Sequence, residues 1–256
     1  MRWPSQARPR SPLGIALRGR LGYDPTAWRV NDSNLGRWCS VHLLVTGGSG
    51  VLGRATIPLL RAQGHETDSP APAQLDLFDP VAVARAVDDA AGILHLATRI
   101  PPRERASERE AWRENDRLRA DASRLLVDAA LAAETEVYVQ PSITFLYPAE
   151  GLVDEETPLG HVPEYLRSTL AAEEETARFA AAGRRGVVLR LGLLDGPGTG
   201  NELPNSRFGS TLHVADAGRA LHAALALPSG IYNVCRDRDH VSNERFKRVS
   251  GWRPER

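Results

Sequence analysis

Apolar and polar positions alternate in blocks along residues 41–256, and these blocks predict strands and helices in turn. Short apolar runs bounded by turn residues are typical of buried strands, whereas apolar residues three and four apart indicate amphipathic helices. The runs predict strands near 42–46, 65–68, 93–97, 136–141 and 186–191. The periodic segments predict helices near 51–63, 80–90, 108–133, 164–183 and 214–227.

This alternation predicts an α/β fold, a Rossmann-like doubly wound parallel sheet with helices on both faces. Right-handed crossovers place the carboxyl ends of the strands at one crevice, and ligands of such sheets bind there. We therefore expect the chemistry in the loops that follow the strands.

The first predicted strand runs into "VTGGSGVLGR", in which Gly47, Gly50 and Gly53 have the spacing G-x-x-G-x-x-G. Glycines let the backbone turn tightly and approach phosphates, and the helix N-terminus that follows offers free N–H groups and a partial positive charge. A plain glycine turn has the same letters, but the strand–loop–helix context favours a dinucleotide site. Pro58 is expected to kink the helix or shift its start.

Seven further segments follow the glycine loop in an order that resembles the extended short-chain dehydrogenase/reductases, specifically the NAD-dependent epimerase/dehydratase family. They are "LDLFDP" (75–80), "ILHLAT" (93–98), "VYVQPSITFLYP" (137–148), "LRLGLLDGPG" (189–198), "LHVADAGRAL" (212–221), "GIYNV" (230–234) and "GWRP" (251–254). The resemblance implies NAD or NADP as cofactor. It implies cofactor contacts from Gly47, Ser49, Gly50, Val51, Leu52, Gly53, Arg54, Asp76, Leu77, Leu96 and Ala97, with Asp76 at the adenine.

The choice between NAD and NADP stays open at this point. The family's ribose-binding acid is not evident, since Ala71 stands at its place, and Asp68 replaces it only if the second strand is short. Arg54 leans toward a 2′-phosphate, although an exposed helix arginine is the commoner case.

Enzymes of this family use a tyrosine in Y-x-x-x-K as acid or base, and the lysine lowers the pKa of that tyrosine and holds the cofactor's ribose. Tyr165 is the candidate tyrosine, with Glu173 eight residues on, as the family often has. Thr169 stands where the lysine belongs. The only lysine of the chain, Lys247, follows Asn243 by four residues, so no Y-x-x-x-K exists.

The other positions of the expected site are also altered. Ser142 and Thr144 are the candidate substrate-binding hydroxyls, but they flank Ile143, where the family keeps its serine or threonine. Because side chains alternate along a strand, both should face away from the cofactor unless Pro141 marks a bulge. Asp195 replaces the tyrosine of Y-G-P. The family's helix asparagine corresponds to Asn115 by residue type and to Arg119 by spacing.

Composition narrows the remaining classes. The formal charge is zero, with 32 basic and 32 acidic residues, so nothing indicates nucleic acid or an acidic membrane surface. No apolar run is long enough to span a bilayer. Two cysteines, Cys39 and Cys235, predict a reducing cytoplasm without a disulfide framework. The seven histidines lack metal-ligand spacing, so no metal is expected. The 31 arginines against one lysine indicate GC-rich coding.

Residues 1–40 hold seven arginines, two acids and four prolines without a periodic pattern. A targeting peptide and a disordered binding arm are two interpretations. The preferred one is a mis-assigned start, with translation beginning at Val41, so that residues 41–256 form the NAD(P)-binding domain.

Only fourteen residues (199–212) separate Gly198 from His213, which predicts a reduced C-terminal substrate lobe and a pocket that is small, open or completed by a partner. The leading hypothesis is an NAD(P)-dependent oxidoreductase, epimerase or dehydratase for a small carbonyl or sugar-derived substrate. In it Tyr165 is the acid or base, and Ser142 or Thr144 binds substrate. The alternative is a catalytically inactive NAD(P)-binding sensor or partner-binding protein. By analogy with the family, a homodimer would form through the two long helices near 108–133 and 164–183.

Overall fold

The computed structural model of the chain describes residues 40–148, 150–205, 209–237 and 239–256. Residues 1–39, and with them the hypotheses on their origin, lie outside this range. The strands are β1 (His42–Thr46), β2 (Glu66–Asp68), β3 (Gly92–His95), β4 (Val137–Ile143), β5 (Arg185–Leu191), β6 (Leu193–Asp195), β7 (Thr211–His213) and β8 (Gly230–Val234). The α-helices are α1 (Val51–Ala62), α2 (Pro80–Val87), α3 (Arg113–Arg117), α4 (Ser123–Ala132), α5 (Arg167–Ala181), α6 (Val214–Ala224) and α7 (Glu244–Ser250).

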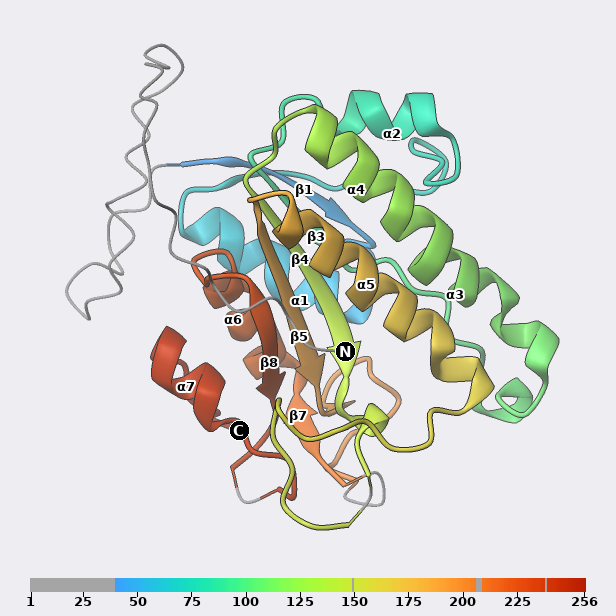
Figure 1. Ribbon diagram of the computed structural model, residues 1–256, viewed down its shortest axis with the longest axis vertical. Coiled ribbons are helices and arrows are strands. Elements are labelled where there is room, and N and C mark those ends of the chain that lie inside the picture. The colour runs from blue at the N-terminus through green and yellow to red at the C-terminus, as the bar shows by residue number, and fades with distance from the viewer. Residues whose placement is uncertain (1–39, 149, 206–208, 238) are drawn as a thin grey trace.

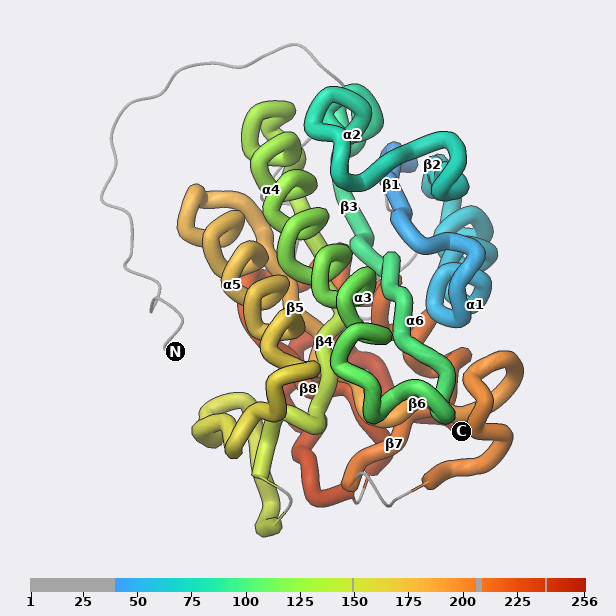
Figure 2. Tube along the Cα trace, turned by 90° about the vertical axis from the view of Figure 1, so that its right-hand side faces the viewer, coloured from blue at the N-terminus to red at the C-terminus, as the bar shows by residue number. Residues whose placement is uncertain are grey.

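Six of the strands form one sheet in the order β2-β1-β3-β4-β5-β8, and every neighbouring pair is parallel. Helices cover both faces: α2, α4 and α5 lie on one side, and α1, α6 and α7 lie on the other (Figures 1 and 2). The predicted α/β fold with a doubly wound parallel sheet is confirmed.

The sheet changes direction between β1 and β3. From β1 the chain goes outward to β2, then returns to place β3 on the opposite side of β1 and continues toward β8. At such a switch point the loops leaving the two central strands diverge and open a crevice. The glycine loop after β1 and the segment after β3 are therefore the two walls of the expected ligand site.

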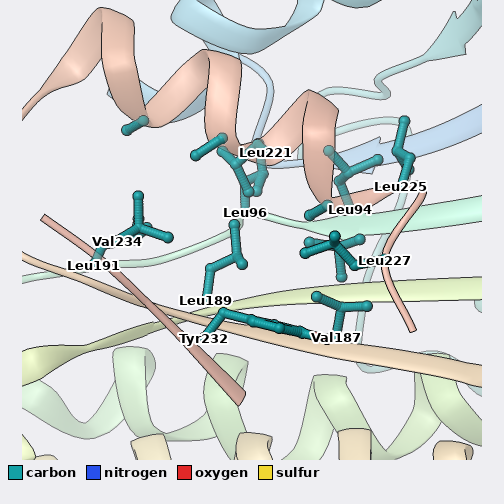
Figure 3. Close-up of a cluster of buried hydrophobic side chains, with 14 of the residues drawn as sticks. Leu94, Leu96, Val187, Leu189, Leu191, Leu221, Leu225, Leu227, Tyr232 and Val234 are labelled. Carbon is teal, nitrogen blue, oxygen red and sulfur yellow. The ribbon is translucent and has the colours of Figure 1, made fainter. Parts of the chain in front are cut away.

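The larger apolar core fills the space between the sheet and the helix pair α1 and α6. Leucine and valine side chains from β3, β5 and β8 point toward α6, which contributes Leu221 (Figure 3). α6 approaches α1 closely because of Gly218, where a Cβ would lie 2.8 Å from the carbonyl oxygen of Ala55. This packing fixes α1, and with it the glycine loop, against the sheet.

The predicted helix over 108–133 is divided in the structure. A 3₁₀ turn (Arg109–Trp112) leads into α3, and a π-helical turn (Leu118–Ala122) joins α3 to α4. A π turn has one residue more than an α turn and moves the side chains around it; such turns are frequent at functional sites. The apolar spacing of the sequence did not distinguish it from an α-helix.

Neither Pro58 nor Pro141 interrupts its element. α1 runs without interruption through Pro58, which lies on the exposed side of the helix, where a carbonyl left without its N–H partner can bind water. β4 pairs with β5 residue by residue from Val137 to Ile143, so Pro141 marks no bulge between these two strands.

The C-terminal lobe is small. β6 and β7 form a two-stranded parallel sheet, and Val153 makes an isolated bridge with Val241. A minor apolar cluster of Tyr147, Val153, Cys235 and Val241 lies beneath it. These segments follow the carboxyl ends of the strands and border the expected crevice.

Candidate cofactor and catalytic site

The glycine loop after β1 is held by backbone-to-backbone packing. A Cβ on Gly47 would lie 2.6 Å from backbone atoms of Leu96 and Ala97, and a Cβ on Gly53 would lie 2.4 Å from Gly48. Gly47 also has φ 73°, a left-handed conformation that glycine adopts without strain. Glycine is thus required at positions 47 and 53, and the loop after β1 touches the segment after β3.

The start of α1 is arranged to receive an anion. Gly50 is the N-cap, and it has no side chain to occupy the first N–H groups of the helix. Those N–H groups carry the positive end of the helix dipole. The loop itself is closed by a hydrogen bond from Gly50 N to Gly47 O at 2.9 Å. A cradle that a Cβ would fill, next to an uncapped helix N-terminus, fits a dinucleotide pyrophosphate.

The remaining residues expected at the cofactor lie around this loop. Val51 and Leu52 begin α1, and Ser49 is exposed. Arg54 bonds back to the carbonyl oxygen of Ser49, and Gly198 lies beside its guanidinium. Asp76 is exposed and accepts a hydrogen bond from Phe78 N at 2.9 Å, followed by the half-buried Leu77.

The second strand is short, which is the condition under which Asp68 could replace the family's ribose-binding acid. β2 has only three residues, so Asp68 is its last residue, and its side chain is 67 % exposed at 3.2 Å from His42. A pocket of about 620 Å³ borders Asp68 and Ser69. Ser69, which was not predicted, donates a hydrogen bond to Val45 O and lies so close to Gly48 that only glycine fits there.

Tyr165 lies just before α5. It belongs to a 3₁₀ turn before α5 (Glu164–Leu166), and its side chain is 40 % exposed. Its ring packs on the indole of Trp112, with 5.1 Å between ring centroids. Tyr165 is therefore partly open to solvent, while its ring packs on Trp112 on one side.

Ser142 is buried and engaged in a structural network on the α5 face of the sheet. Its hydroxyl donates to a carboxylate oxygen of Glu173 on α5. Arg190 of β5 makes a bidentate ion pair with the same carboxylate, at 2.9 and 2.7 Å, and donates to the Tyr147 hydroxyl at 2.8 Å. The Glu173 carboxylate raises the pKa of Arg190 above its usual range. The network ties α5, β4 and β5 together.

Thr144 is also buried, on a different set of partners. Its hydroxyl lies 2.6 Å from Ser210 Oγ and 3.3 Å from Leu191 O. The structure thus brings neither Ser142 nor Thr144 together with Tyr165 through any contact among the described residues.

The position of the absent lysine is occupied from another helix. Arg119, in the π turn between α3 and α4, donates a hydrogen bond to Thr169 Oγ1, and both side chains are buried. Burial lowers the pKa of Arg119 to about 10, and Asp116 partly offsets that. The sequence had placed Arg119 at the family's asparagine position. Asn115, one turn earlier, instead accepts a hydrogen bond from Arg99 N.

His95 connects this π turn to the glycine loop. Burial lowers its pKa to about 4, with a smaller contribution from the Arg119 charge, so the imidazole is neutral at pH 7. Its Nε2 lies 3.1 Å from Leu118 O and therefore carries the proton, which leaves Nδ1 to accept from Thr46 Oγ1 at 2.6 Å. Thr46 directly precedes Gly47.

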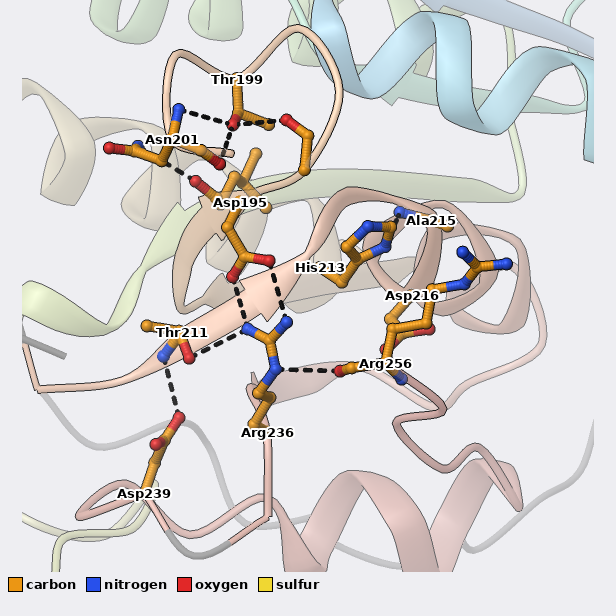
Figure 4. Close-up of polar contacts among 12 residues, drawn as sticks. Asp195, Thr199, Asn201, Thr211, His213, Ala215, Asp216, Arg236, Asp239 and Arg256 are labelled. Atoms are coloured by element: carbon orange, nitrogen blue, oxygen red, sulfur yellow. Dashed lines mark hydrogen bonds and ion pairs between the residues drawn. The ribbon is translucent and has the colours of Figure 1, made fainter. Parts of the chain in front are cut away.

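Asp195, which stands at the position of the Y-G-P tyrosine, forms a separate cluster. It is buried and makes a bidentate ion pair with Arg236, which also donates to Thr211 Oγ1 and to Arg256 O (Figure 4). Asp239 accepts a hydrogen bond from Thr211 N. The pair joins β6 and β7 to the segment after β8, so it organises the small lobe.

Comparison with known proteins identifies the family of this chain. The profile of the NAD dependent epimerase/dehydratase family matches residues 43–213. The chain belongs to this family. The family assignment predicted from the ordered motifs is confirmed, and so is the class of cofactor, NAD or NADP.

A curated relative supports the same assignment for this epimerase/dehydratase family member. The 3-diazoavenalumate denitrifying reductase of a Streptomyces species is 33% identical over 214 residues. The alignment covers 74% of this chain and 65% of that protein, so the chain spans less than two thirds of the relative's length.

Solved structures show the same fold at low identity. UDP-N-acetylglucosamine 4-epimerase from Bacillus cereus is 18% identical, with a TM-score of 0.70 over 85% of this chain and 94% of that one. RMD from Pseudomonas aeruginosa, complexed with NADPH, is 19% identical, with a TM-score of 0.68 over 85% and 93%. WbmG from Bordetella bronchiseptica, in complex with NAD, is 17% identical, with a TM-score of 0.67 over 86% and 91%.

Membranes and a second copy of the chain are the remaining partners to consider. Among the helices in the described part of the chain, none is long and apolar enough to cross a membrane. The homodimer through the two long helices stays a prediction.

Proposed function

We propose that this family member is an NAD(P)H-dependent reductase that transfers a hydride to a small electrophile whose reduction needs no proton from a Tyr–Lys pair. The observation that carries the proposal is a contrast within the site. The glycine cradle is complete, while Thr169 replaces the lysine and the two candidate hydroxyls are engaged with Glu173 and Ser210. The cofactor would supply the hydride, and the residues expected around the glycine loop would hold it.

A diazo or diazonium carbon is the substrate class that fits this contrast. When a carbon bearing N₂⁺ receives a hydride, a C–H bond forms, the C–N bond breaks, and the electron pair of that bond leaves with N₂. Two electrons pass from the reduced cofactor to the substrate, and no oxygen has to be protonated. The 33%-identical relative is named as a denitrifying reductase of a diazo compound, which supports this class.

A small carbonyl or sugar-derived substrate is the second candidate. The partial exposure of Tyr165 favours it, because an exposed tyrosine can approach a ligand oxygen. The lysine that assists this tyrosine in the family is absent from α5, where Thr169 stands instead. In this version Tyr165 is the acid or base, and Ser142 or Thr144 would reach substrate only after leaving its present partner.

Cofactor titration followed by turnover assays tests the proposal. We expect NADPH or NADH to bind saturably by fluorescence, and an arenediazonium carboxylate to be reduced with release of N₂. Turnover should persist in Tyr165→Phe. Gly53→Ala, which places a methyl group against Gly48, should lose binding and turnover, and heat-inactivated protein corrects for uncatalysed reduction.

Each other result assigns a different function. Turnover of aldehydes, ketones or UDP-sugars alone, abolished in Tyr165→Phe, would establish the carbonyl reaction in place of the diazo one. Saturable binding without turnover of any of these substrates would indicate the inactive sensor or partner-binding protein. Absence of binding by either cofactor would refute the reductase altogether.

A further inference from the structure

Arg119 is a buried cation without a carboxylate partner. Its side chain is 7% exposed, and its hydrogen bond goes to the neutral hydroxyl of Thr169. Within the described chain no carboxylate oxygen lies at ion-pair distance from it; Asp116, the nearest acid to act on it, pairs with Arg109 instead. A guanidinium loses its hydration when it is buried, and an anion or several hydrogen-bond acceptors normally compensate for that loss. Arg119 therefore lacks acceptors for most of its five N–H donors.

The unused donors of Arg119 are not sealed inside the protein. None of its nitrogens is among the fully buried polar atoms without a hydrogen-bond partner in the described residues. The guanidinium tip thus keeps access to the space beside it. That space adjoins α5 at Thr169, one turn after Tyr165.

The backbone around Arg119 is fixed to the glycine loop. The π turn begins at Leu118, whose carbonyl accepts from His95, and His95 in turn bonds Thr46 at the end of β1. Arg119 directly follows Leu118 in this turn. A short chain of contacts therefore links the backbone of the π turn to β1, the strand that leads into Gly47.

We propose that Arg119 supplies, from the π turn, the cofactor-holding cation that α5 lacks at Thr169, and that its free N–H donors bind ribose hydroxyls of the dinucleotide. Thr169 accepts one donor and thereby sets the direction of the guanidinium. The inference rests on the proposed cofactor site. Arg119 would thus perform, from the π turn, the ribose-holding role that the family's Y-x-x-x-K motif gives to a lysine on α5.

Cofactor affinity is the direct readout. Arg119→Met keeps the approximate length of the side chain and removes the charge, and we expect NADPH or NADH to bind about 10- to 100-fold more weakly, as for the loss of hydrogen bonds from a charged group. Arg119→Lys keeps the charge and should bind more tightly than Arg119→Met. Arg124→Met is the matched control, because Arg124 lies one turn later on α4 with an exposed side chain, and its affinity should stay within about twofold.

A rescue separates cofactor positioning from a purely structural role. In the double variant Arg119→Ala/Thr169→Lys, the cation returns to α5 and enters the space that the arginine leaves. We expect the double variant to bind the cofactor about tenfold more tightly than Arg119→Met does, a gain that a merely structural role would not produce. Thermal unfolding without cofactor verifies that each variant is folded.

The outcomes distinguish the inference from the proposed function. If the native protein binds neither NADH nor NADPH, the cofactor site itself is refuted. If it binds and folded Arg119→Met binds equally well, only the role of Arg119 is overturned. A folded double variant that binds no better than Arg119→Met would also overturn it. Should Arg119→Met not fold, Arg119→Lys and Arg119→Gln replace it, and equal affinity of these two would overturn the assignment.

Discussion

Two buried guanidinium groups meet successive turns of α5 and differ in every other respect. Arg190 faces Glu173 and is neutralised by a bidentate ion pair, so its pKa is raised. Arg119 faces Thr169, one turn earlier, and burial without a paired acid lowers its pKa to about 10. The first group holds α5 to the sheet. The second has one hydrogen-bond partner, the Thr169 hydroxyl, and leaves its other N–H donors without an acceptor among the described residues. An arginine packed against α5 thus stabilises the fold at one turn of the helix, and at the preceding turn we propose that an arginine binds the cofactor.

Breaking the Arg190 pair should have the largest effect. Arg190→Met leaves the Glu173 carboxylate buried without its cation, and we expect the free energy of unfolding to fall by about 3–5 kcal/mol in urea denaturation. Replacing both partners, as Arg190→Met/Glu173→Leu, should cost much less. Arg178→Met removes an exposed pair on the same helix and should cost about 0–1 kcal/mol. A loss below about 1 kcal/mol in Arg190→Met would contradict the structural role.

The next effect concerns pH and the region around Arg119. The folded pKa of His95 is about 4, below its unfolded value near 6.5, so the unfolded chain binds the proton more readily in this range. The contribution of His95 to stability is complete above pH 6.5 and declines as the pH falls toward 4, by roughly 3 kcal/mol in full. Urea unfolding at neutral pH and near pH 4.5 measures it.

A variant isolates the His95 share of this pH dependence. His95→Gln can still donate to Leu118 O and accept from Thr46, but it does not titrate. Its unfolding free energy should therefore decline less steeply with acid than that of the native protein. His65 and His222 also have lowered pKa values because of burial, so some decline remains in the variant. An identical slope in both proteins would exclude His95 as its source.

The smallest effect is expected for Arg119 in the absence of cofactor. Arg119→Met removes a desolvated charge along with its hydrogen bond to Thr169, and these two changes oppose each other. We expect the unfolding free energy of the cofactor-free protein to change by no more than about 1 kcal/mol, in contrast with Arg190→Met. A loss of about 3 kcal/mol or more would place both arginines in the same structural class and erase the difference between the two regions.

The sequence predicted the sheet and the cofactor loop well because both depend on local patterns. Short apolar runs identified the strands of the main sheet except β8, which the family resemblance located. The glycine spacing identified the loop, in which Gly53 packs on Gly48 and Gly47 packs on the backbone of Leu96 and Ala97. The short β2, which makes Asp68 its last residue, was a stated condition that only the structure could settle.

The chemistry was harder to predict because it depends on contacts between distant positions. Arg119 and Thr169 are 50 residues apart, and Asp195 and Arg236 are 41 apart, so no spacing rule connects them. The π turn escaped prediction for another reason: its extra residue shifts the apolar face of the helix, but residues 113–121 carry only one large apolar side chain, Leu118, so the shift leaves no visible pattern. The spacing of the motifs did place Arg119 at the position of the family's helix asparagine. It could not predict which side chain Arg119 would contact.

The contact between Arg119 and Thr169 also constrains how this protein could have evolved. A lysine introduced at position 169 would bring a second buried cation against the guanidinium, whereas loss of Arg119 alone would leave this part of the cleft without a cation. We expect either single change to be unfavourable and the double change to be tolerated, which is epistasis between neighbouring sites. We therefore expect a relative of this chain to carry either arginine at the position of Arg119 or lysine at the position of Thr169, and not both.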